Sequence, residues 1–169
     1  LLTCASPDGP KRGAALADPG LIEDGAVACL AGQIVAVGRT DDVLAQIDDP
    51  DAATVIDARG MVVTPGFVDP HTHALWAGDR AGAFELRIAG ATYLEIMQAG
   101  GGIMNTVRAT RAASLDDLIA QTLPRLDTML MHGTTTAEIK TGYGLDTATE
   151  LKMLDAIRLL DGEHPMDLV

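Results

Sequence analysis

Two histidines with one residue between them, His71 and His73, have the type and the spacing that a metal site requires. They end an apolar, β-branched stretch that starts at Met61, and Asp69 stands just ahead of them. On an extended chain, residues i and i+2 point to the same face, so the two imidazoles are expected to project together. Neutral imidazole is a good ligand for zinc and for other first-row transition metals. We therefore predict that both histidines bind one metal ion, against the simpler interpretation that a His-x-His pair in a surface loop has no role.

Short apolar runs separated by turn residues precede this stretch and predict a small β-rich region. The turn Ala31-Gly32 is typical of a tight hairpin, and Cys29, just before it, is expected to be a small buried hydrophobic residue. Several short strands of this kind predict part of a β-sandwich over residues 1–61. The predicted elements are strands over 26–30, 33–37 and 54–57 and a short helix over 41–46.

From Val62 onward the pattern changes to strands that alternate with helices, which predicts a parallel α/β sheet. Ser and Thr residues followed three positions later by Asp or Glu mark the expected helix starts, and glycines mark the ends. Pro124 is expected to kink or interrupt the longest helix. The predicted order is a strand ending at the histidines, a loop over 74–80, a helix from 92 to the glycines 100–102, a helix from 114 to 132–133, a strand over 134–140, a helix from 147 to 161–162 and a strand from 166.

Composition excludes several classes of partner. The chain of 169 residues has a formal net charge of −12 and only 3% aromatic residues, whereas a nucleic-acid partner requires clustered Lys and Arg. No apolar run approaches the roughly 20 residues that span a bilayer. Cys4 and Cys29 have no metal-ligand spacing and indicate no disulfide framework, which fits a reducing compartment. We therefore expect neither nucleic acid nor membrane as a partner.

The stretch from Pro65 to His73 closely resembles the first-strand signature of the amidohydrolase superfamily, metal-dependent hydrolases built on a (β/α)8 barrel. Over residues 64–154 the chain resembles one family of that superfamily, the imidazolonepropionases, which open a ring in histidine degradation. Residues 1–20 match that family poorly. The blocks that carry the resemblance are 71–73, 77–80, 84–87, 100–103, 106–111, 138–145 and 150–154.

This resemblance implies hydrolysis of 4-imidazolone-5-propanoate, a small molecule, to N-formimino-L-glutamate in the cytoplasm, with one zinc or iron ion. It implies that His71 and His73 are the metal ligands and that Arg80 and Tyr143 bind the substrate, with Tyr93 as a weaker candidate near the pocket. It also allows a homodimer of the full-length enzyme. The residue types suit these roles, because a guanidinium holds a carboxylate with two parallel hydrogen bonds and a tyrosine hydroxyl offers a further donor.

The fold that the resemblance implies is larger than this chain. A (β/α)8 barrel needs about 250 residues, so residues 62–169 are expected to be the start of an incomplete TIM barrel, with about three of its eight strands. A catalytic zinc site has three protein ligands, and the chain supplies two. The resemblance implies that a further histidine ligand, a metal-binding aspartate and the acid–base residues lie beyond Val169. We therefore expect the chain alone to be inactive, and poorly soluble because its sheet has an open edge.

Two alternatives stay open at this point. The parent enzyme could be another amidohydrolase, such as a cyclic ureidase or an aminohydrolase of a heterocycle, and then Arg80 would be a solvated charge and Tyr143 a packing aromatic. The chain could instead be non-catalytic, as a truncated product or a binding module. Among the other polar residues, Lys140 is expected to be structural, His132 to bind carbonyls at a helix end, and His164 to lie in a loop.

Overall fold

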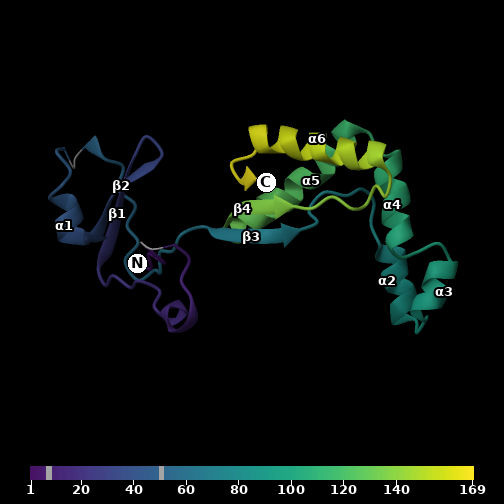
Figure 1. Ribbon diagram of the computed structural model, residues 1–169, viewed down its shortest axis with the longest axis horizontal. Coiled ribbons are helices and arrows are strands. Elements are labelled where there is room, and N and C mark those ends of the chain that lie inside the picture. The colour runs from purple at the N-terminus through teal and green to yellow at the C-terminus, as the bar shows by residue number, and fades with distance from the viewer. Residues whose placement is uncertain (7–8, 50–51) are drawn as a thin grey trace. The chain divides into compact units, whose positions relative to one another are not determined.

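The computed structural model describes residues 1–6, 9–49 and 52–169 and separates them into two compact units, Leu1–Pro65 and Gly66–Val169 (Figure 1). The boundary falls at Pro65-Gly66, where proline removes a backbone donor and glycine loosens the chain. Each of the predicted site residues lies in the second unit. The assignment of residues 1–61 to a β-sandwich stays a prediction.

The first unit is organised around one hairpin, as the sequence predicts. Strands β1 (Gly25–Leu30) and β2 (Gln33–Arg39) pair antiparallel, and the short helix α1 (Thr40–Leu44) follows directly. Both turn residues have positive φ, 51° at Ala31 and 78° at Gly32, as a two-residue turn that matches the strand twist requires. The 3-10 helix η1 (Gly13–Ala17) precedes the hairpin.

Two predictions for this unit are wrong. Residues 54–57 form no strand, and the side chains of Val55 and Ile56 are 76% and 87% exposed. A β-branched sequence becomes a strand only where a neighbour pairs with its backbone, and in the described part of the chain these residues take part in no ladder. Cys29 is exposed rather than buried, because it lies beyond a bulge at the turn end of the hairpin.

The second unit contains a parallel sheet with the order β3-β4-β5, which confirms the predicted α/β alternation. Its strands are β3 (Phe67–Thr72), β4 (Thr134–Ile139) and β5 (Asp167–Leu168). The predicted first strand starts too early, because β3 begins at Phe67, after Pro65, and not at Val62. It also lies at the edge of the described sheet, with Phe67 and Val68 58% and 65% exposed.

Five helices connect these strands, and the sequence signals predict three of them. Thr92 and Ser114 each form a complete capping box, with Glu95 and Asp117, at the starts of α3 and α5. Helices α2 and α4 were not predicted, because no side-chain cap marks the start of either. The helices are α2 (Ala81–Ile88), α3 (Tyr93–Gln98), α4 (Ile103–Ala112), α5 (Leu115–Met131) and α6 (Thr147–Glu163).

Two details of the long helices differ from the sequence prediction. Pro124 does not interrupt α5, whose turns on either side of it are anchored in the core by Leu118 and Leu126, both fully buried. The cap of α6 is Asp146, one residue earlier than predicted, whose carboxylate accepts the backbone N–H of Thr149 at 2.8 Å. The C-terminal end of α5 is as predicted, since the His132 ring lies 2.7 Å from the carbonyl oxygen of Thr128.

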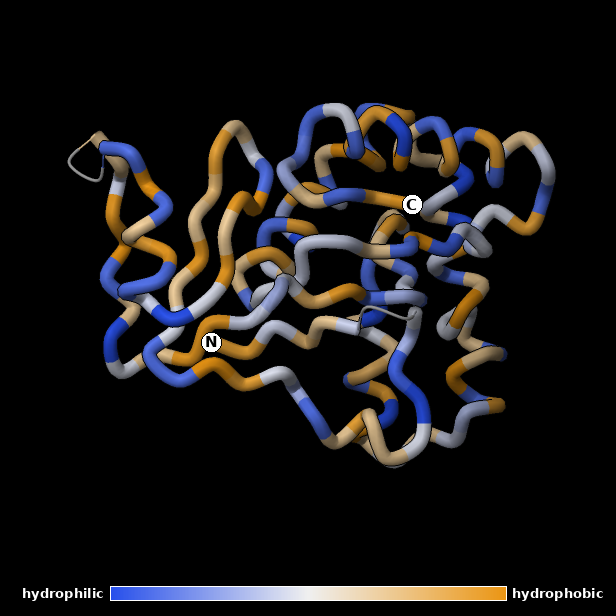
Figure 2. Tube along the Cα trace, turned by 60° about the vertical axis from the view of Figure 1, so that its left-hand side comes forward, coloured by the Kyte–Doolittle hydropathy of each residue, from blue (hydrophilic) through white to orange (hydrophobic). Residues whose placement is uncertain are grey.

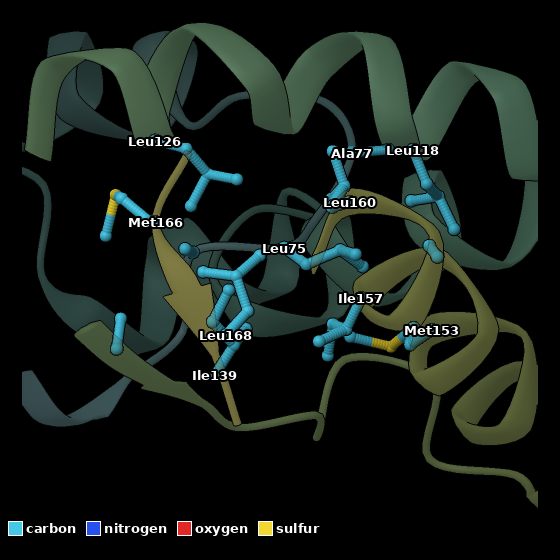
Figure 3. Packing of buried hydrophobic residues seen from close by; sticks show 13 residues of the cluster. Leu75, Ala77, Leu118, Leu126, Ile139, Met153, Ile157, Leu160, Met166 and Leu168 are labelled. Carbon is cyan, nitrogen blue, oxygen red and sulfur yellow. The ribbon is translucent and has the colours of Figure 1, made fainter. Parts of the chain in front are cut away.

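The core of the second unit lies between the sheet and the helices α5 and α6, which run along one side of β4 (Figure 1). Figure 3 shows Leu75, Leu160 and Leu168 pointing into the same space from a loop, a helix and a strand. Hydrophobic and hydrophilic segments alternate along the helices of this unit (Figure 2), as expected for helices that bury one face. His164 lies in the loop between α6 and β5, as predicted, and its side chain is buried, with Nε2 3.3 Å from an Asp127 carboxylate oxygen.

Candidate active site

The two histidines of the predicted metal site lie at the C-terminal end of β3. His71 is the next-to-last residue of this strand, and His73 is the first residue after its end. Their rings are 5.7 Å apart between centroids and inclined by 75°. The Asp69 carboxylate accepts the backbone N–H of His71 at 3.1 Å, which fixes the chain just ahead of the pair. The side chains therefore project together, as the i, i+2 spacing predicts.

This arrangement fits part of a metal site. Two imidazoles on one zinc ion, with Zn–N bonds of about 2.0–2.1 Å and near-tetrahedral angles, have ring centroids roughly 5–5.5 Å apart. The separation of 5.7 Å between His71 and His73 is close to that distance. Among the described residues, no group of three or more His, Cys, Asp or Glu side chains could hold a metal. The pair therefore supplies two imidazole donors, and their assignment as metal ligands stays a prediction.

The loop after β4 brings Tyr143 to the same edge of the sheet. Gly142 passes so close to His73 that a Cβ at this position would lie 3.5 Å from the imidazole Cε1. The Tyr143 ring lies 5.4 Å from the His73 ring between centroids, and the Arg80 guanidinium carbon lies 5.8 Å from the centre of the Tyr143 ring. His73, Tyr143 and Arg80 thus form a continuous row of side chains.

Arg80 and Tyr143 line one cavity of about 280 Å³ together with Trp76, Asp79 and Thr106. The Arg80 Nε donates to the Thr106 hydroxyl at 2.9 Å, which directs the guanidinium from the start of α2 toward α4. The exposed guanidinium can still offer its other N–H groups to a ligand. A cavity with one guanidinium and one phenol suits a small anion that carries a flat ring.

The indole of Trp76 is fixed in this cavity by Arg125 from helix α5. The Arg125 guanidinium carbon lies 3.4 Å from the centre of the Trp76 ring, and Nη1 donates to the carbonyl oxygens of Ala74 and Trp76 at 3.1 and 2.8 Å. Burial lowers the pKa of Arg125, but a guanidinium remains charged at neutral pH. The loop that follows the histidines is therefore tied to the core by a residue that the sequence did not single out.

A second, larger cavity of about 440 Å³ adjoins the first through Arg80. Tyr93 lies on its wall, as do Phe84 and Arg87 from helix α2, and the Tyr93 side chain is 70% exposed. Tyr93 is thus near the predicted pocket but not in the cavity that holds Tyr143. Glu138 and Lys140 pair with each other on the sheet, in accord with a structural role for Lys140.

Comparison with known proteins identifies the family of this chain. A model described as the amidohydrolase family matches residues 54–168, and the chain belongs to this family. The chain is also similar to imidazolonepropionases, as the sequence blocks indicate. It is 58% identical to the imidazolonepropionase of Herpetosiphon aurantiacus over 163 residues, which are 96% of this chain and 37% of that protein. It is 55% identical to that of Chloroflexus aggregans over 169 residues, 100% of this chain and 39% of that protein.

The chain therefore spans little more than a third of the length of these relatives. A third relative, the imidazolonepropionase of Symbiobacterium thermophilum, is 54% identical over 161 residues, 95% of this chain and 38% of its own. In the parts of the chain that the structure describes, no helix has both the length and the apolar character needed to cross a membrane.

Sequence reasoning missed the residues that support this site rather than those that form it. Thr106 lies within a block of the family resemblance and Trp76 lies between two of them, but nothing in their type indicated a wall of the cavity. Arg125 lies in the middle of a predicted amphipathic helix, where a charged residue is expected to face the solvent. Only the fold shows that these side chains reach the loop after β3.

Proposed function

We propose that this chain is part of an imidazolonepropionase, which hydrolyses the cyclic amide of 4-imidazolone-5-propanoate to N-formimino-L-glutamate. The observation that carries the proposal is the row of His73, Tyr143 and Arg80 at one sheet edge, in a chain 58% identical to an imidazolonepropionase. The other part of the proposal is architectural: residues 66–169 supply the first three strands of a (β/α)8 barrel, whose active sites lie at the C-terminal ends of the strands.

The residues of this chain would bind and orient the substrate. His71 and His73 would be two ligands of one metal ion, either zinc or iron. Such an ion makes water a stronger nucleophile near neutral pH and polarises an amide carbonyl. Arg80 would pair with the propanoate carboxylate, and the Tyr143 hydroxyl would donate to the ring or to the carboxylate.

The order of these side chains supports one orientation of the substrate along the row. The imidazoles lie at the β3 end, where the amide has to be attacked, and the guanidinium lies beyond the Tyr143 ring. A substrate with a flat ring and a short anionic arm can contact both ends at once. The walls Trp76 and Thr106 would exclude water from the side of the ring.

The proposal is tested in a chimera, in which this chain replaces the matching segment of the Herpetosiphon aurantiacus imidazolonepropionase. We expect turnover of 4-imidazolone-5-propanoate, and a KM that Arg80→Met raises by about 10–100-fold, because hydrogen bonds to charged groups contribute about 1.5–3 kcal/mol. An imidazolone without the propanoate arm should not respond to this substitution. The exposed Arg158→Met on α6 serves as the matched control.

Two outcomes would contradict the proposal. A folded chimera that leaves 4-imidazolone-5-propanoate intact but hydrolyses a cyclic ureide or deaminates a heterocycle would indicate another amidohydrolase. An Arg80→Met chimera with an unchanged KM would remove the assignment of the carboxylate to Arg80 while leaving the reaction class in place. The cytoplasmic location and the homodimer stay predictions from the resemblance.

A further inference from the structure

The loop that carries Tyr143 is bound to the start of helix α6 by a single carboxylate. Glu150 Oε2 accepts the backbone N–H of Gly142 at 2.8 Å. Glu150 Oε1 accepts the backbone N–H groups of Gly144 and Leu145, each at 2.8 Å. The residues on both sides of the tyrosine are therefore held by the same side chain.

A guanidinium holds the same loop through groups of the opposite polarity. The Arg111 Nε, at the end of α4, donates to the carbonyl oxygen of Gly144 at 2.6 Å and lies 3.0 Å from the Asp146 carboxylate. Lys152 Nζ in turn donates to the carbonyl oxygen of Ala113 at 2.6 Å, which ties the end of α4 to α6. The loop is thus held between helices α4 and α6: its N–H groups donate to Glu150, and one of its carbonyl oxygens accepts from Arg111.

The backbone of this loop is one that the chain would not adopt unaided. Leu145 has a φ of 56°, in the left-handed region that a branched side chain disfavours, and Gly142 has a φ of 128°. At Gly144, an added Cβ would lie 2.8 Å from the Thr149 Cβ, so the loop can approach α6 this closely only with glycine. Such a conformation persists only where its surroundings hold it.

The charge of Glu150 is suited to this role. Burial opposes the charged form, but hydrogen bonds from the Leu145 N–H, the Thr141 hydroxyl and the two glycine N–H groups outweigh it and lower the pKa of Glu150. The carboxylate is therefore ionised at neutral pH, and an ionised carboxylate can accept all of these hydrogen bonds at once. If Glu150 served only to interact with the positive, N-terminal end of the α6 dipole, it would need no contact with the loop.

We propose that Glu150 and Arg111 are positioning residues, which fix the Tyr143 side chain beside His73 and so determine the affinity of the site for its substrate. The inference rests on the proposed function, because it assigns Tyr143 to substrate binding. Neither side chain touches the cavity of Arg80 and Tyr143, so both act through the loop. When the hydrogen bonds from Glu150 or Arg111 to the loop are lost, the loop is in the binding conformation for only a fraction of the time. The apparent affinity for the substrate falls in proportion to that fraction.

The test is Glu150→Gln in the chimera, with Glu163→Gln on the exposed last turn of the same helix as the matched control. The amide has one acceptor oxygen instead of two, and its NH2 group faces a backbone N–H, so the loop loses at least one bond. We expect KM to rise about 10-fold with kcat within about 3-fold, which is the signature of lost binding rather than lost folded enzyme. Arg111→Met should act in the same direction, and Arg111→Lys, which keeps the positive charge and hydrogen-bond donors, should act less.

A double-mutant cycle separates positioning from general stability. In a Tyr143→Phe background there is no hydroxyl left to place, so Glu150→Gln should raise KM less than about 2-fold further. Equal factors in the two backgrounds, or a loss of kcat alone with an unchanged KM, would overturn the proposal. Amide exchange of Leu145 gives a second measurement, and its protection should fall in Glu150→Gln but not in Glu163→Gln.

The failure of this inference differs from the failure of the proposed function. A chimera that does not hydrolyse 4-imidazolone-5-propanoate contradicts the function, and the amide exchange of Leu145 still tests whether Glu150 holds the loop. A chimera that hydrolyses it with the same KM in the original and in Glu150→Gln supports the function and overturns the positioning role.

Discussion

The ends of strands β3 and β4 both deliver side chains to the candidate active site, but they do so by different physical means. At the end of β3, His71 and His73 are brought together by the alternation of an extended chain, with one local bond from Asp69. At the end of β4, Tyr143 is placed by a loop with a left-handed leucine, which Glu150 and Arg111 hold from two helices.

This difference separates what is local from what is not. The histidine pair needs only an extended backbone, which the sequence itself favours. The tyrosine needs contacts between residues up to 33 positions apart, such as Arg111 with Gly144. Substitutions near the histidines should therefore affect the site directly, whereas those near the tyrosine should act through distant partners.

The largest effect is expected at the histidines themselves. In the chimera, His71→Ala or His73→Ala should abolish metal binding and reduce turnover by more than about 100-fold, since even the outer partners of metal ligands cost 10–100-fold. Metal content by elemental analysis and kcat are the measurements, and His132→Ala, at the end of α5, is the control. A His73→Ala enzyme with full metal content would show that His73 is not a metal ligand.

The next effect tests the core that both strand ends share. Leu160 is fully buried among core residues from both regions, whereas its neighbour Leu159 on α6 is 43% exposed. Leu160→Ala should reduce the free energy of unfolding by about 2–5 kcal/mol, and Leu159→Ala by much less. Urea unfolding of the two variants is the measurement. Equal losses would mean that the helix does not pack on the sheet as described.

A smaller effect is expected where Arg125 supports the loop after β3. Arg125→Met removes the cation over the Trp76 ring and leaves the carbonyl oxygens of Ala74 and Trp76 without this donor, at a cost of about 1–3 kcal/mol. Trp76 is the single tryptophan of the chain, so its emission maximum reports the change directly. We expect a red shift with an unchanged metal content. Loss of metal in Arg125→Met would show that the histidines are not positioned by the strand alone.

The smallest effect is a dependence on pH. Because the folded-state pKa of Glu150 lies below its ordinary value of 4.5, this carboxylate stabilises the fold fully above that value, and the contribution is lost as the pH falls through the lower, folded-state pKa. The difference in Tm between the original and Glu150→Gln should therefore be constant from pH 7 to 5 and shrink toward pH 3. A difference that grows in acid would contradict the assigned sign.

Much of the fold could be predicted from local signals. The capping boxes of Thr92 and Ser114 mark two helix starts, and the turn Ala31-Gly32 marks the hairpin. The strand expected over residues 54–57 did not form, because a strand depends on a partner that a propensity cannot reveal. The helices α2 and α4 were missed for a related reason, since neither start carries a side-chain cap.

The sequence by itself determined the family, the parallel α/β order and the common direction of His71 and His73. Each of these depends only on the types of residues and on their spacing over short stretches of the chain. Only the tertiary structure decided which side chains surround Arg80 and Tyr143, and which ones hold them there. Trp76 and Thr106 line the cavity, and Arg125 and Glu150 hold its loops through contacts between separate elements. Such contacts depend on how helices pack on a sheet, which the spacing of residues along the chain does not encode.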